Sequence, residues 1–416
     1  MHRIHRIHAH VAPTSPACDG SDHEVVIVAA QRTPITKARR GGLKDTTPDV
    51  LLGHVLQAVL HQTQLDPTRV GDIVVGNVLE PGAGAAMARM AQLAAGIPHS
   101  VPLHVVNRQC SSGLEAVATV SAAIAAGYYD IGIAAGVESM SPHSLGTDLP
   151  NVKWDAMSAV QDAMDCTVPM GMTSENVAHA FGISRLEQDH FAARSHAKAA
   201  AAQAKGWFTD EITSVSTTVK DKEGQEKVVC ISQDDGIRAD TTVDQLGKLR
   251  PAFKDGGSTT AGNSSQVSDG AAAVLLMRRS VAKSMGLSIL GRLVSYAVVG
   301  VPPSLMGIGP AVAIPAALQK AGLTPEQIDV FEINEAFASQ AVYCVKTLGL
   351  PLEKVNPKGG AIALGHPLGC TGARQVATLL YELKRTKQCY GVISMCIGTG
   401  MGAAAVLAVD HNSEDT

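Results

Sequence analysis

The chain has 416 residues, enough for two or three domain-sized units and a large buried core, so its size permits an enzyme. Hydrophobic residues make up 45%, charged residues 17% and aromatic residues 3%, with 40 glycines, which is typical of a soluble α/β protein rich in small residues. The formal charge of −4 and the pI near 6.4 provide no basic field for nucleic acid. No apolar run reaches the roughly 18 to 20 residues that a membrane span needs.

The first 24 residues differ from the rest, with Arg3, Arg6, five histidines and no acid before Asp19. They lack the apolar centre of a secretory signal, which leaves a mitochondrial presequence, a receptor-read address or a disordered basic tail. Arg3-Ile4, five residues and then His10-Val11 resemble the N-terminal peroxisomal targeting nonapeptide, from which Val11 departs because Leu or Ala is usual there. We therefore expect a targeting leader over residues 1–24.

Strand and helix patterns alternate after this leader. Continuous Val/Ile-rich runs predict strands, and apolar residues three or four apart predict helices. Strand, helix and strand in this order indicate parallel βαβ units. The predicted strands are residues 25–30, 72–78, 101–106 and 129–136, and the predicted helices are residues 48–63 and 112–127.

The middle of the chain, residues 147–250, has a different character. It contains a long polar stretch from Lys220 to Lys227 and two helical patterns, at 174–181 and 185–205. A structureless loop of this length would be improbable in a compact protein. We expect an inserted lid or loop domain here.

The C-terminal third repeats the pattern of the N-terminal part. Leu65–Ile73 parallels Leu323–Val330, an offset of 323 − 65 = 258 residues, and both lead through a proline turn into a strand. We therefore expect two similar halves around a different middle. The predicted halves are residues 25–146 with 251–288, and residues 289–412. The predicted C-terminal elements are helices at 315–321 and 372–385 and strands at 329–333 and 390–395.

The eight cysteines are scattered, without a CxxC pair or a His-x-x-x-His run, which argues against a zinc site. Reduced intracellular thiols are the default for a long chain without a secretory signal. Cys110 lies between a predicted strand and a predicted helix, where unpaired N–H groups would lower the pKa of its thiol and favour the nucleophilic thiolate. The alternative is a buried, inert cysteine.

Two glycine-rich segments add candidate groups. His366 lies in a glycine-dense loop ahead of a helix, where an imidazole can take a thiol proton near neutral pH. An ordinary surface-loop histidine is the alternative. Cys396 lies where a strand runs into Gly398-Thr399-Gly400-Met401-Gly402, a turn whose N–H groups could form an oxyanion hole, bind phosphate or only reverse the chain.

These segments, together with Asn334-Glu335-Ala336-Phe337, closely resemble the thiolase family over residues 25–409, nearest to its peroxisomal 3-ketoacyl-CoA branch. Residues 170–176, 262–273 and 306–310 also look like family blocks. The resemblance implies an α/β fold of two βαβαβαββ halves in an α-β-α-β-α sandwich with an inserted loop domain. It also implies an acyltransferase that cleaves 3-ketoacyl-CoA in β-oxidation, uses CoA as co-substrate, and holds no metal or permanent cofactor. A homodimer in the peroxisomal matrix, delivered by an import receptor, would follow, with mitochondria as the alternative.

The resemblance also implies site roles. Cys110 would attack the C3 carbonyl while His366 takes its proton, and Cys396 would protonate the departing enolate and then deprotonate CoA. His366 and a water held by Asn334 would stabilise the enolate oxygen, and the N–H groups of Cys110 and Gly398 the other oxyanion.

The family pattern indicates that CoA lies along the middle segment. Ser265 would lie near the pantetheine and Arg238 near the nucleotide, although Arg238 could equally be a solvated loop charge. The resemblance further implies that acyl-CoA contacts Met170, Phe253, Ala261, Met306 and Phe337. Short-chain relatives often carry His before Met-Gly, and Pro169 stands there instead, which favours a wider range of chain lengths.

Three alternatives remain open. A condensing enzyme of the same fold would pair its cysteine with two histidines, whereas the second partner here is Cys396. A biosynthetic acetoacetyl-CoA thiolase would be separated only by kinetics. A non-catalytic acyl-CoA or lipid carrier should have lost one of Cys110, His366 or Cys396, and the sequence retains all three.

Overall fold

A computed structural model describes residues 20–143, 151–221 and 223–410. Most of the expected leader, including Cys18, lies outside these ranges, as does the expected domain boundary at 146/147. The strands are β1 Val25–Arg32, β2 Thr36–Lys37, β3 Asp72–Gly76, β4 Leu103–Val106, β5 Ile131–Ser139, β6 Val215–Lys220, β7 Glu226–Ile231, β8 Ser268–Arg278, β9 Arg292–Gly300, β10 Val330–Ile333, β11 Tyr390–Ile397 and β12 Met401–Ala408.

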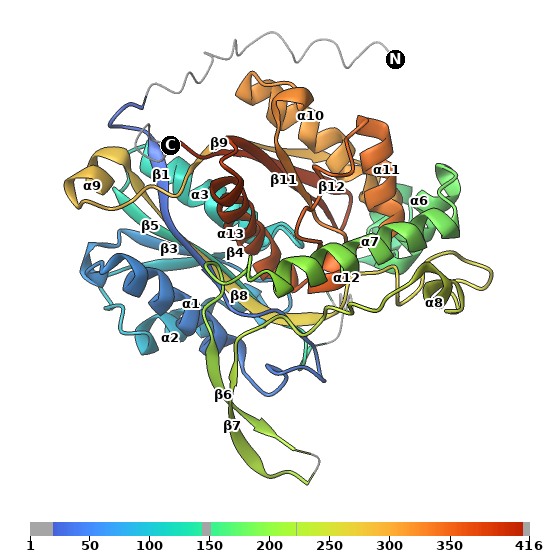
Figure 1. Cartoon of the computed structure of the whole chain (residues 1–416), viewed down its shortest axis with the longest axis horizontal. Helices are drawn as coiled ribbons and strands as arrows, with labels where there is room; N and C mark the ends of the chain where they lie inside the picture. Colours follow the sequence, from blue (N-terminus) through green and yellow to red (C-terminus); the bar gives the residue numbers. More distant parts are fainter. Residues whose placement is uncertain (1–19, 144–150, 222, 411–416) are drawn as a thin grey trace.

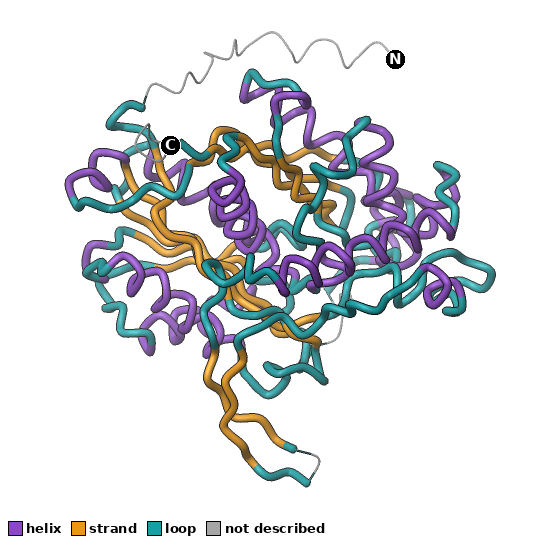
Figure 2. The backbone as a smooth tube through the Cα atoms, viewed as in Figure 1, coloured by secondary structure: helices purple, strands orange, loops and turns teal. Residues whose placement is uncertain are grey.

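Helices connect and cover these strands (Figures 1 and 2). The helices are α1 Pro48–Thr63, α2 Ala85–Ala94, α3 Ser112–Ala125, α4 Trp154–Met157, α5 Gln161–Asp165, α6 Met170–Ala180, α7 Arg185–Ala204, α8 Val243–Gly247, α9 Arg279–Ser284, α10 Gly309–Ala321, α11 Ala338–Leu348, α12 Ala361–Leu364 and α13 Leu368–Thr386. Short 3₁₀ turns lie between them, among them η4 Pro303–Ile308.

The two main sheets have the same strand order. The first runs β1-β8-β5-β3-β4 and the second β9-β12-β11-β10. In each sheet the first three strands of this order pair antiparallel and the next pair is parallel, β5 with β3 and β11 with β10. Over the described residues the second sheet has four strands, but Val355 forms a parallel bridge with Phe331 in β10, at the position that β4 occupies beside β3 in the first sheet. The two similar halves expected from the internal repeat are therefore confirmed.

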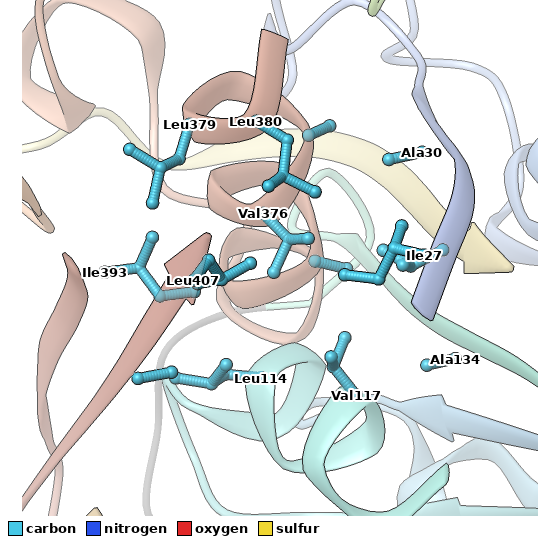
Figure 3. Packing of buried hydrophobic residues seen from close by; sticks show 14 of the residues in the cluster. Ile27, Ala30, Leu114, Val117, Ala134, Val376, Leu379, Leu380, Ile393 and Leu407 are labelled. Atoms are coloured by element: carbon cyan, nitrogen blue, oxygen red, sulfur yellow. The ribbon is translucent and has the colours of Figure 1, made fainter. Parts of the chain in front are cut away.

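The sheets face each other across a central helical layer. Helices α3 and α13 lie between them, α1 covers the outer face of the first sheet, and α10 covers the outer face of the second (Figure 1). Figure 3 shows side chains from both central helices meeting strand residues such as Ile27, Ala134, Ile393 and Leu407. The result is the expected layered α-β-α-β-α sandwich. Burial of apolar area on both faces of each sheet supplies the main stabilising term.

Several expected elements are confirmed with small shifts. Helix α1 has the expected bounds, whereas β3 ends two residues early, at Gly76. Three expected helix starts are wrong, and in the first of them α6 begins at Met170 rather than 174. Helix α10 begins at Gly309 rather than 315 because Pro310 occupies its first turn and Pro315 is accommodated inside it. Helix α13 begins at Leu368 rather than 372, so its glycine-containing start is already helical. The sequence interpretation missed the strands β2, β6, β7, β8, β9 and β12 and the helices α2, α4, α5, α8, α9, α11 and α12.

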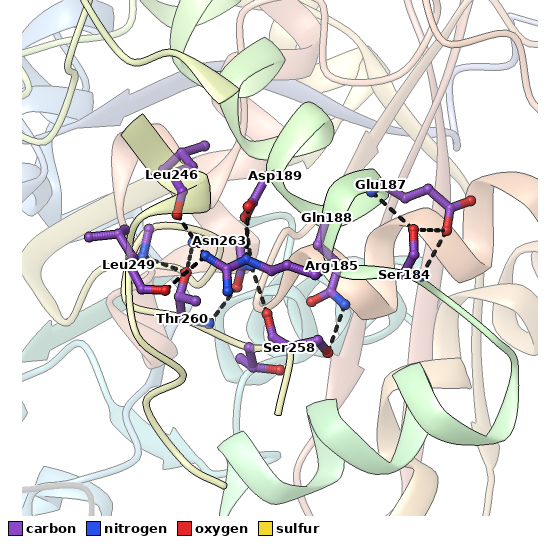
Figure 4. Close-up of polar contacts among 12 residues, drawn as sticks. Ser184, Arg185, Glu187, Gln188, Asp189, Leu246, Leu249, Ser258, Thr260 and Asn263 are labelled. Carbon is purple, nitrogen blue, oxygen red and sulfur yellow. Dashed lines mark hydrogen bonds and ion pairs between the residues drawn. The ribbon is translucent and has the colours of Figure 1, made fainter. Parts of the chain in front are cut away.

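The described residues of the middle segment, 151–221 and 223–250, contain helices α4 to α8 and hairpin β6–β7. Lys220 ends β6 and Glu226 begins β7, and this hairpin projects from the body at the bottom of Figure 1. A capping box at Ser184 starts α7, and Arg185 donates to the carbonyl oxygens of Leu246 and Leu249 (Figure 4). Asn263 donates to Asp189 at 3.0 Å, which attaches the strand-like segment before β8 to α7.

Buried charges attach this segment to both halves. Glu211, between α7 and β6, accepts from Arg32 of β1 at 2.7 Å and from Lys358 of the second half at 2.9 Å. Asp234 pairs with Arg32 as well, and all four side chains are buried. Since an unpaired buried charge is costly, this network fixes how the three parts meet. Over residues 20–143, 151–221 and 223–410, no helix combines the length and apolar character that crossing a bilayer requires.

Candidate active site

The site lies where the two central helices begin. A Cβ atom on Gly113 of α3 would lie 2.6 Å from the carbonyl oxygen of Gly369 in α13, and Gly372 lies equally tightly against Leu114. Glycine is needed here because any larger residue would separate the helices. This contact brings together the residues just before each helix. Those residues include Cys110 before α3 and His366 before α13.

Cys110 lies in a tight turn. Gln109 before it has a φ of 48°, and the backbone N–H of Gly398 is directed at the Cys110 sulfur. Burial raises the pKa of the Cys110 thiol to about 11, although hydrogen bonds from the N–H groups of Gly398 and Cys110 itself act in the opposite direction. The expected lowering of this pKa is therefore wrong for the free protein. Removal from water outweighs the nearby N–H groups, so the resting sulfur is a protonated thiol.

Cys396 lies near the end of β11, two residues before Gly398, and is fully buried. Burial raises the pKa of its thiol well above the usual value, and the nearby Cys110 acts in the same direction. The turn after β11 contains Thr399 at a φ of 70° and Gly400 at 91°. These values point to a constrained reversal, after which β12 returns antiparallel. The Gly-rich segment therefore positions a sulfur and an N–H group beside Cys110.

His366 is held through both ring nitrogens. Its Nδ1 lies 2.6 Å from Thr371 Oγ1, and that hydroxyl donates to the carbonyl oxygen of Pro367 at 3.2 Å. The hydroxyl proton is thus in use, so Nδ1–H is the donor to Thr371. Asn334 Nδ2 then donates to Nε2 at 3.3 Å. This network assigns the tautomer in which Nε2 carries the lone pair.

The electrostatics keep the imidazole neutral. Burial lowers the pKa of His366 to about 3, and the guanidinium of Arg374 in α13 lowers it further. Only 5% of His366 is exposed. At neutral pH the site therefore holds a neutral base and two neutral thiols. Asn334 Oδ1, also buried, accepts no hydrogen bond from the described residues.

An apolar wall surrounds the second sulfur. Met306, Ala336, Phe337 and Cys396 form one buried cluster, with Met170 packed against it. Phe253 meets the ring of Phe337 edge-on, with centroids 6.2 Å apart. Of the residues expected to contact acyl-CoA, Met170, Met306 and Phe337 thus pack around Cys396, and Phe253 packs against Phe337.

The remaining residues expected to contact CoA are more exposed to solvent than the apolar cluster around Cys396. Ser265 is half-buried, and its N–H donates to the carbonyl oxygen of Ala336 at 2.9 Å, which attaches it to the wall. Ala261 and Arg238 are exposed. The N–H of Arg238 donates to Nδ1 of the buried His196 at 3.2 Å, which fixes the loop to α7.

The sequence interpretation missed two residues of this site. Thr371, which bonds His366, was visible as a hydroxyl five residues after it, in a helix start that is otherwise small and apolar. Glu138 was visible as a lone acid in the apolar strand that became β5. A buried acid needs partners, so its position in such a run was an available signal. In the described ranges no group of three or more His, Cys, Asp or Glu side chains is arranged to hold a metal ion.

The chain is similar to known proteins over most of its length. The family description "Thiolase, N-terminal domain" matches residues 25–280, and "Thiolase, C-terminal domain" matches residues 287–409. The chain is 62% identical over 426 aligned residues to "3-ketoacyl-CoA thiolase A, peroxisomal" of Mus musculus, covering 99% of this chain and 100% of that protein.

Solved structures are similar as well. The dimeric peroxisomal thiolase of Saccharomyces cerevisiae matches with a TM-score of 0.87 and 50% identity, covering 94% of this chain and 98% of that one. The human mitochondrial 3-ketoacyl-CoA thiolase in complex with CoA matches with a TM-score of 0.82 and 38% identity, covering 93% of this chain and 98% of that one.

Proposed function

Since the chain belongs to the thiolase family, we propose that it is an acyltransferase that cleaves 3-ketoacyl-CoA to acetyl-CoA and a shortened acyl-CoA in fatty-acid β-oxidation. It uses CoA as co-substrate, holds no permanent cofactor, acts in the peroxisome and forms a homodimer. The peroxisomal mouse relative, the dimeric peroxisomal yeast thiolase and the CoA complex of the human mitochondrial thiolase support this proposal. One observation carries the mechanism. The Gly398 N–H is directed at the Cys110 sulfur, with Cys396 two residues away on the same strand end.

Cys110 is the nucleophile of the first half-reaction. Its sulfur attacks the C3 carbonyl while Nε2 of His366 gives up the hydrogen bond from the Asn334 amide and takes the thiol proton. The C2–C3 bond then breaks to leave an acyl thioester on Cys110. Because the resting groups are a neutral thiol and a neutral imidazole, this proton moves as the attack proceeds. The N–H groups of Cys110 and Gly398 bind the oxyanion that forms.

Cys396 moves the second proton. The departing acetyl-CoA enolate takes a proton at C2 from the Cys396 thiol, whose raised pKa keeps it protonated until then. The Cys396 thiolate next deprotonates the incoming CoA, which attacks the thioester, and the released Cys110 sulfur recovers its proton from His366. His366 and a water bound by Asn334 stabilise the enolate oxygen, and the unpartnered Asn334 Oδ1 supports this role.

CoA lies along the middle segment. Ser265 contacts the pantetheine and Arg238 the phosphates of the nucleotide, while the acyl group lies against Met170, Phe253, Met306 and Phe337, with Ala261 at the rim. The wall formed with Phe337 beside Cys396 supports this arrangement. In domain terms, residues 25–146 with 251–288 form one half, 147–250 the loop domain and 289–412 the other half.

The mechanism is tested with cysteine variants. Cys110→Ala should abolish CoA-dependent cleavage while CoA still binds, and Cys396→Ser should slow acyl-enzyme formation and lower the rate by roughly 10²- to 10⁴-fold, because a positioned acid is lost. The exposed Cys389 provides the control, since Cys389→Ala should keep the wild-type rate. Unchanged thiolysis in Cys110→Ala, or a near wild-type rate in Cys396→Ser, would contradict these roles.

The competing functions are separated by substrate. CoA-dependent cleavage measured from acetoacetyl-CoA to long-chain 3-ketoacyl-CoA should show activity across chain lengths. Activity on acetoacetyl-CoA alone would favour a biosynthetic thiolase. Binding without turnover on any substrate would favour a carrier protein.

Residues 1–24 serve as the address that a peroxisomal import receptor reads. The spacing from Arg3 to Val11 and the peroxisomal relatives support this role. Attached to a fluorescent reporter, the segment should direct it to peroxisomes, and an Arg3→Ala reporter should stay diffuse. A diffuse or mitochondrial signal from the unaltered segment would refute the address.

A further inference from the structure

Glu138 is a buried acid that the chemistry described above does not use. It lies in β5 with 1% of its surface exposed. Its carboxylate accepts four hydrogen bonds of 3.0 to 3.2 Å, three from backbone N–H groups and one from a side-chain amide. Such a set of donors is what a buried carboxylate requires. The donors are Asn77 Nδ2 and the N–H groups of Val78, Leu79 and Gly369.

These donors come from both halves of the molecule. Val78 and Leu79 follow β3 in the first half, whereas Gly369 lies in the first turn of α13, three residues after His366. One carboxylate therefore bonds the two halves to each other at the start of α13. The backbones of the two halves are in close contact there, because a Cβ on Gly369 would lie 2.7 Å from the carbonyl oxygen of Gly76.

The same segments surround the nucleophile. The side chains of Val78, Leu79 and Cys110 all pack onto one small cluster formed by Ala38, Met140 and Leu368. Leu368 adjoins Gly369, and Met140 lies two residues after Glu138. The backbone that Glu138 holds thus carries side chains that meet at Cys110.

We propose that Glu138 is a positioning residue for the cleavage reaction, whose carboxylate fixes the loop after β3 to the start of α13 and so sets His366 relative to Cys110. This inference rests on the proposed roles of Cys110 and His366. None of the four hydrogen bonds of the Glu138 carboxylate goes to Cys110, His366 or Cys396. It acts through the loop and helix start that carry the site, and a misplacement of about 1 Å at such a site can cost roughly 100-fold in rate.

The charge of Glu138 shows whether this residue positions the site or activates the Cys110 thiol. Facing it are Glu80 after β3, itself paired with His143, Cys110 before α3 and Cys370 in α13. A negative charge here raises the pKa of Cys110 and so opposes formation of the thiolate. A group that activates the nucleophile electrostatically would instead lower the pKa of Cys110. Its benefit to the reaction is therefore geometric.

The test compares Glu138→Gln with Glu80→Gln, a control that removes a neighbouring carboxylate without a bond to Gly369. In Glu138→Gln the amide NH₂ replaces one acceptor oxygen and faces N–H donors. We expect kcat to fall roughly 10- to 100-fold with KM for CoA unchanged. The pH midpoint for alkylation of Cys110 by iodoacetamide, followed by mass spectrometry, should move down because a negative charge is gone. Glu80→Gln should keep the wild-type kcat.

Two outcomes would overturn the inference. The first is a wild-type kcat in Glu138→Gln. The second is a lower kcat together with a higher KM and an unchanged pH midpoint for Cys110 alkylation, which is the result that general damage to the fold would give. If Glu138→Gln gives no cooperative thermal melt, Glu138→Asp decides. It keeps the charge but shortens the reach, so kcat should fall while the alkylation midpoint stays at the wild-type value, and a wild-type kcat would again overturn the inference.

The proposed function is judged separately in the same experiment. Turnover that persists in Cys110→Ala would reject the roles of Cys110 and His366 whatever Glu138 does. An inactive Cys110→Ala beside a fully active Glu138→Gln would reject only the positioning role.

Discussion

Thr371 determines which nitrogen of His366 carries the lone pair that can act as a base. Its hydroxyl accepts from Nδ1–H because its own proton is donated to the carbonyl oxygen of Pro367. Asn334 fixes the other side of the ring, at Nε2. Since burial and Arg374 already keep the imidazole neutral, the choice of tautomer is what remains to be set, and a single hydroxyl sets it.

This assignment predicts the effect of Thr371→Val. Nδ1–H would lose its acceptor in a buried place, so the ring would rotate or change tautomer, and kcat should fall roughly 10- to 100-fold, as for other buried partners that orient a histidine. Thr371→Ser keeps the hydroxyl and should retain most of the activity. Steady-state kinetics on one 3-ketoacyl-CoA measures both, and equal rates in the Val and Ser variants would contradict the tautomer assignment.

Among the elements, the start of α13 determines how closely the halves approach. Gly369 lies against the ends of β3 and β5, and Gly372 lies against α3. The two central helices can therefore begin side by side, and Cys110 packs against the cluster that contains Leu368, two residues after His366. In the sequence, His366 follows Cys110 by 366 − 110 = 256 residues. The glycines at these positions are needed for contact rather than for an unusual φ, since neither has a positive value.

Gly369→Ala tests this contact. A Cβ there would lie 2.7 to 2.8 Å from backbone atoms of Gly76, Asn77 and Val137, none of which can rotate away. Overpacking of this kind costs about 1–3 kcal/mol. We expect a lower free energy of unfolding in urea and a reduced kcat. Gly247→Ala, in α8 with open space around it, is the control and should be neutral or slightly stabilising. Indistinguishable stabilities of the two variants would reject the contact.

For the whole molecule, a buried acid makes stability depend on pH. Burial raises the pKa of Glu332 to about 7, and Arg374 lies 3.5 Å from its carboxyl group. Near pH 6 the folded chain keeps the Glu332 proton, whereas the unfolded chain, with an ordinary value near 4.5, has lost it. The stabilisation is fully present below about pH 4.5 and is lost as pH rises through about 7.

Replacement of Glu332 by Gln should therefore flatten the pH dependence of unfolding. Between pH 5 and 7 the free energy of unfolding should fall less steeply than in the wild type, by up to about 1.4 kcal/mol per pH unit, because one titrating group is removed. Urea denaturation at fixed protein concentration measures this. Glu326→Gln, at an exposed position in the turn before β10, is the control. An unchanged slope in Glu332→Gln would contradict the raised pKa.

The sequence by itself determined several of the elements and the candidate site residues. Apolar runs such as Val25–Ala30 and helical spacing over Pro48–Thr63 appear as β1 and α1, because local periodicity matches the face that each element buries. The repeat between Leu65–Ile73 and Leu323–Val330 predicted two similar halves, and the two sheets share one strand order. Cys110, His366 and Cys396 were recognisable from their short motifs.

Only the tertiary structure decided how these parts act together. It placed β8 between β1 and β5, a pairing over a long separation that no local pattern encodes. It also reversed the expected pKa shift of Cys110, because burial depends on everything packed around a thiol, whereas the helix start is visible in the sequence. The partners of Glu138 and His366 come from segments brought together by folding. Hydrogen bonds and desolvation act through space, so the local sequence alone could not supply them.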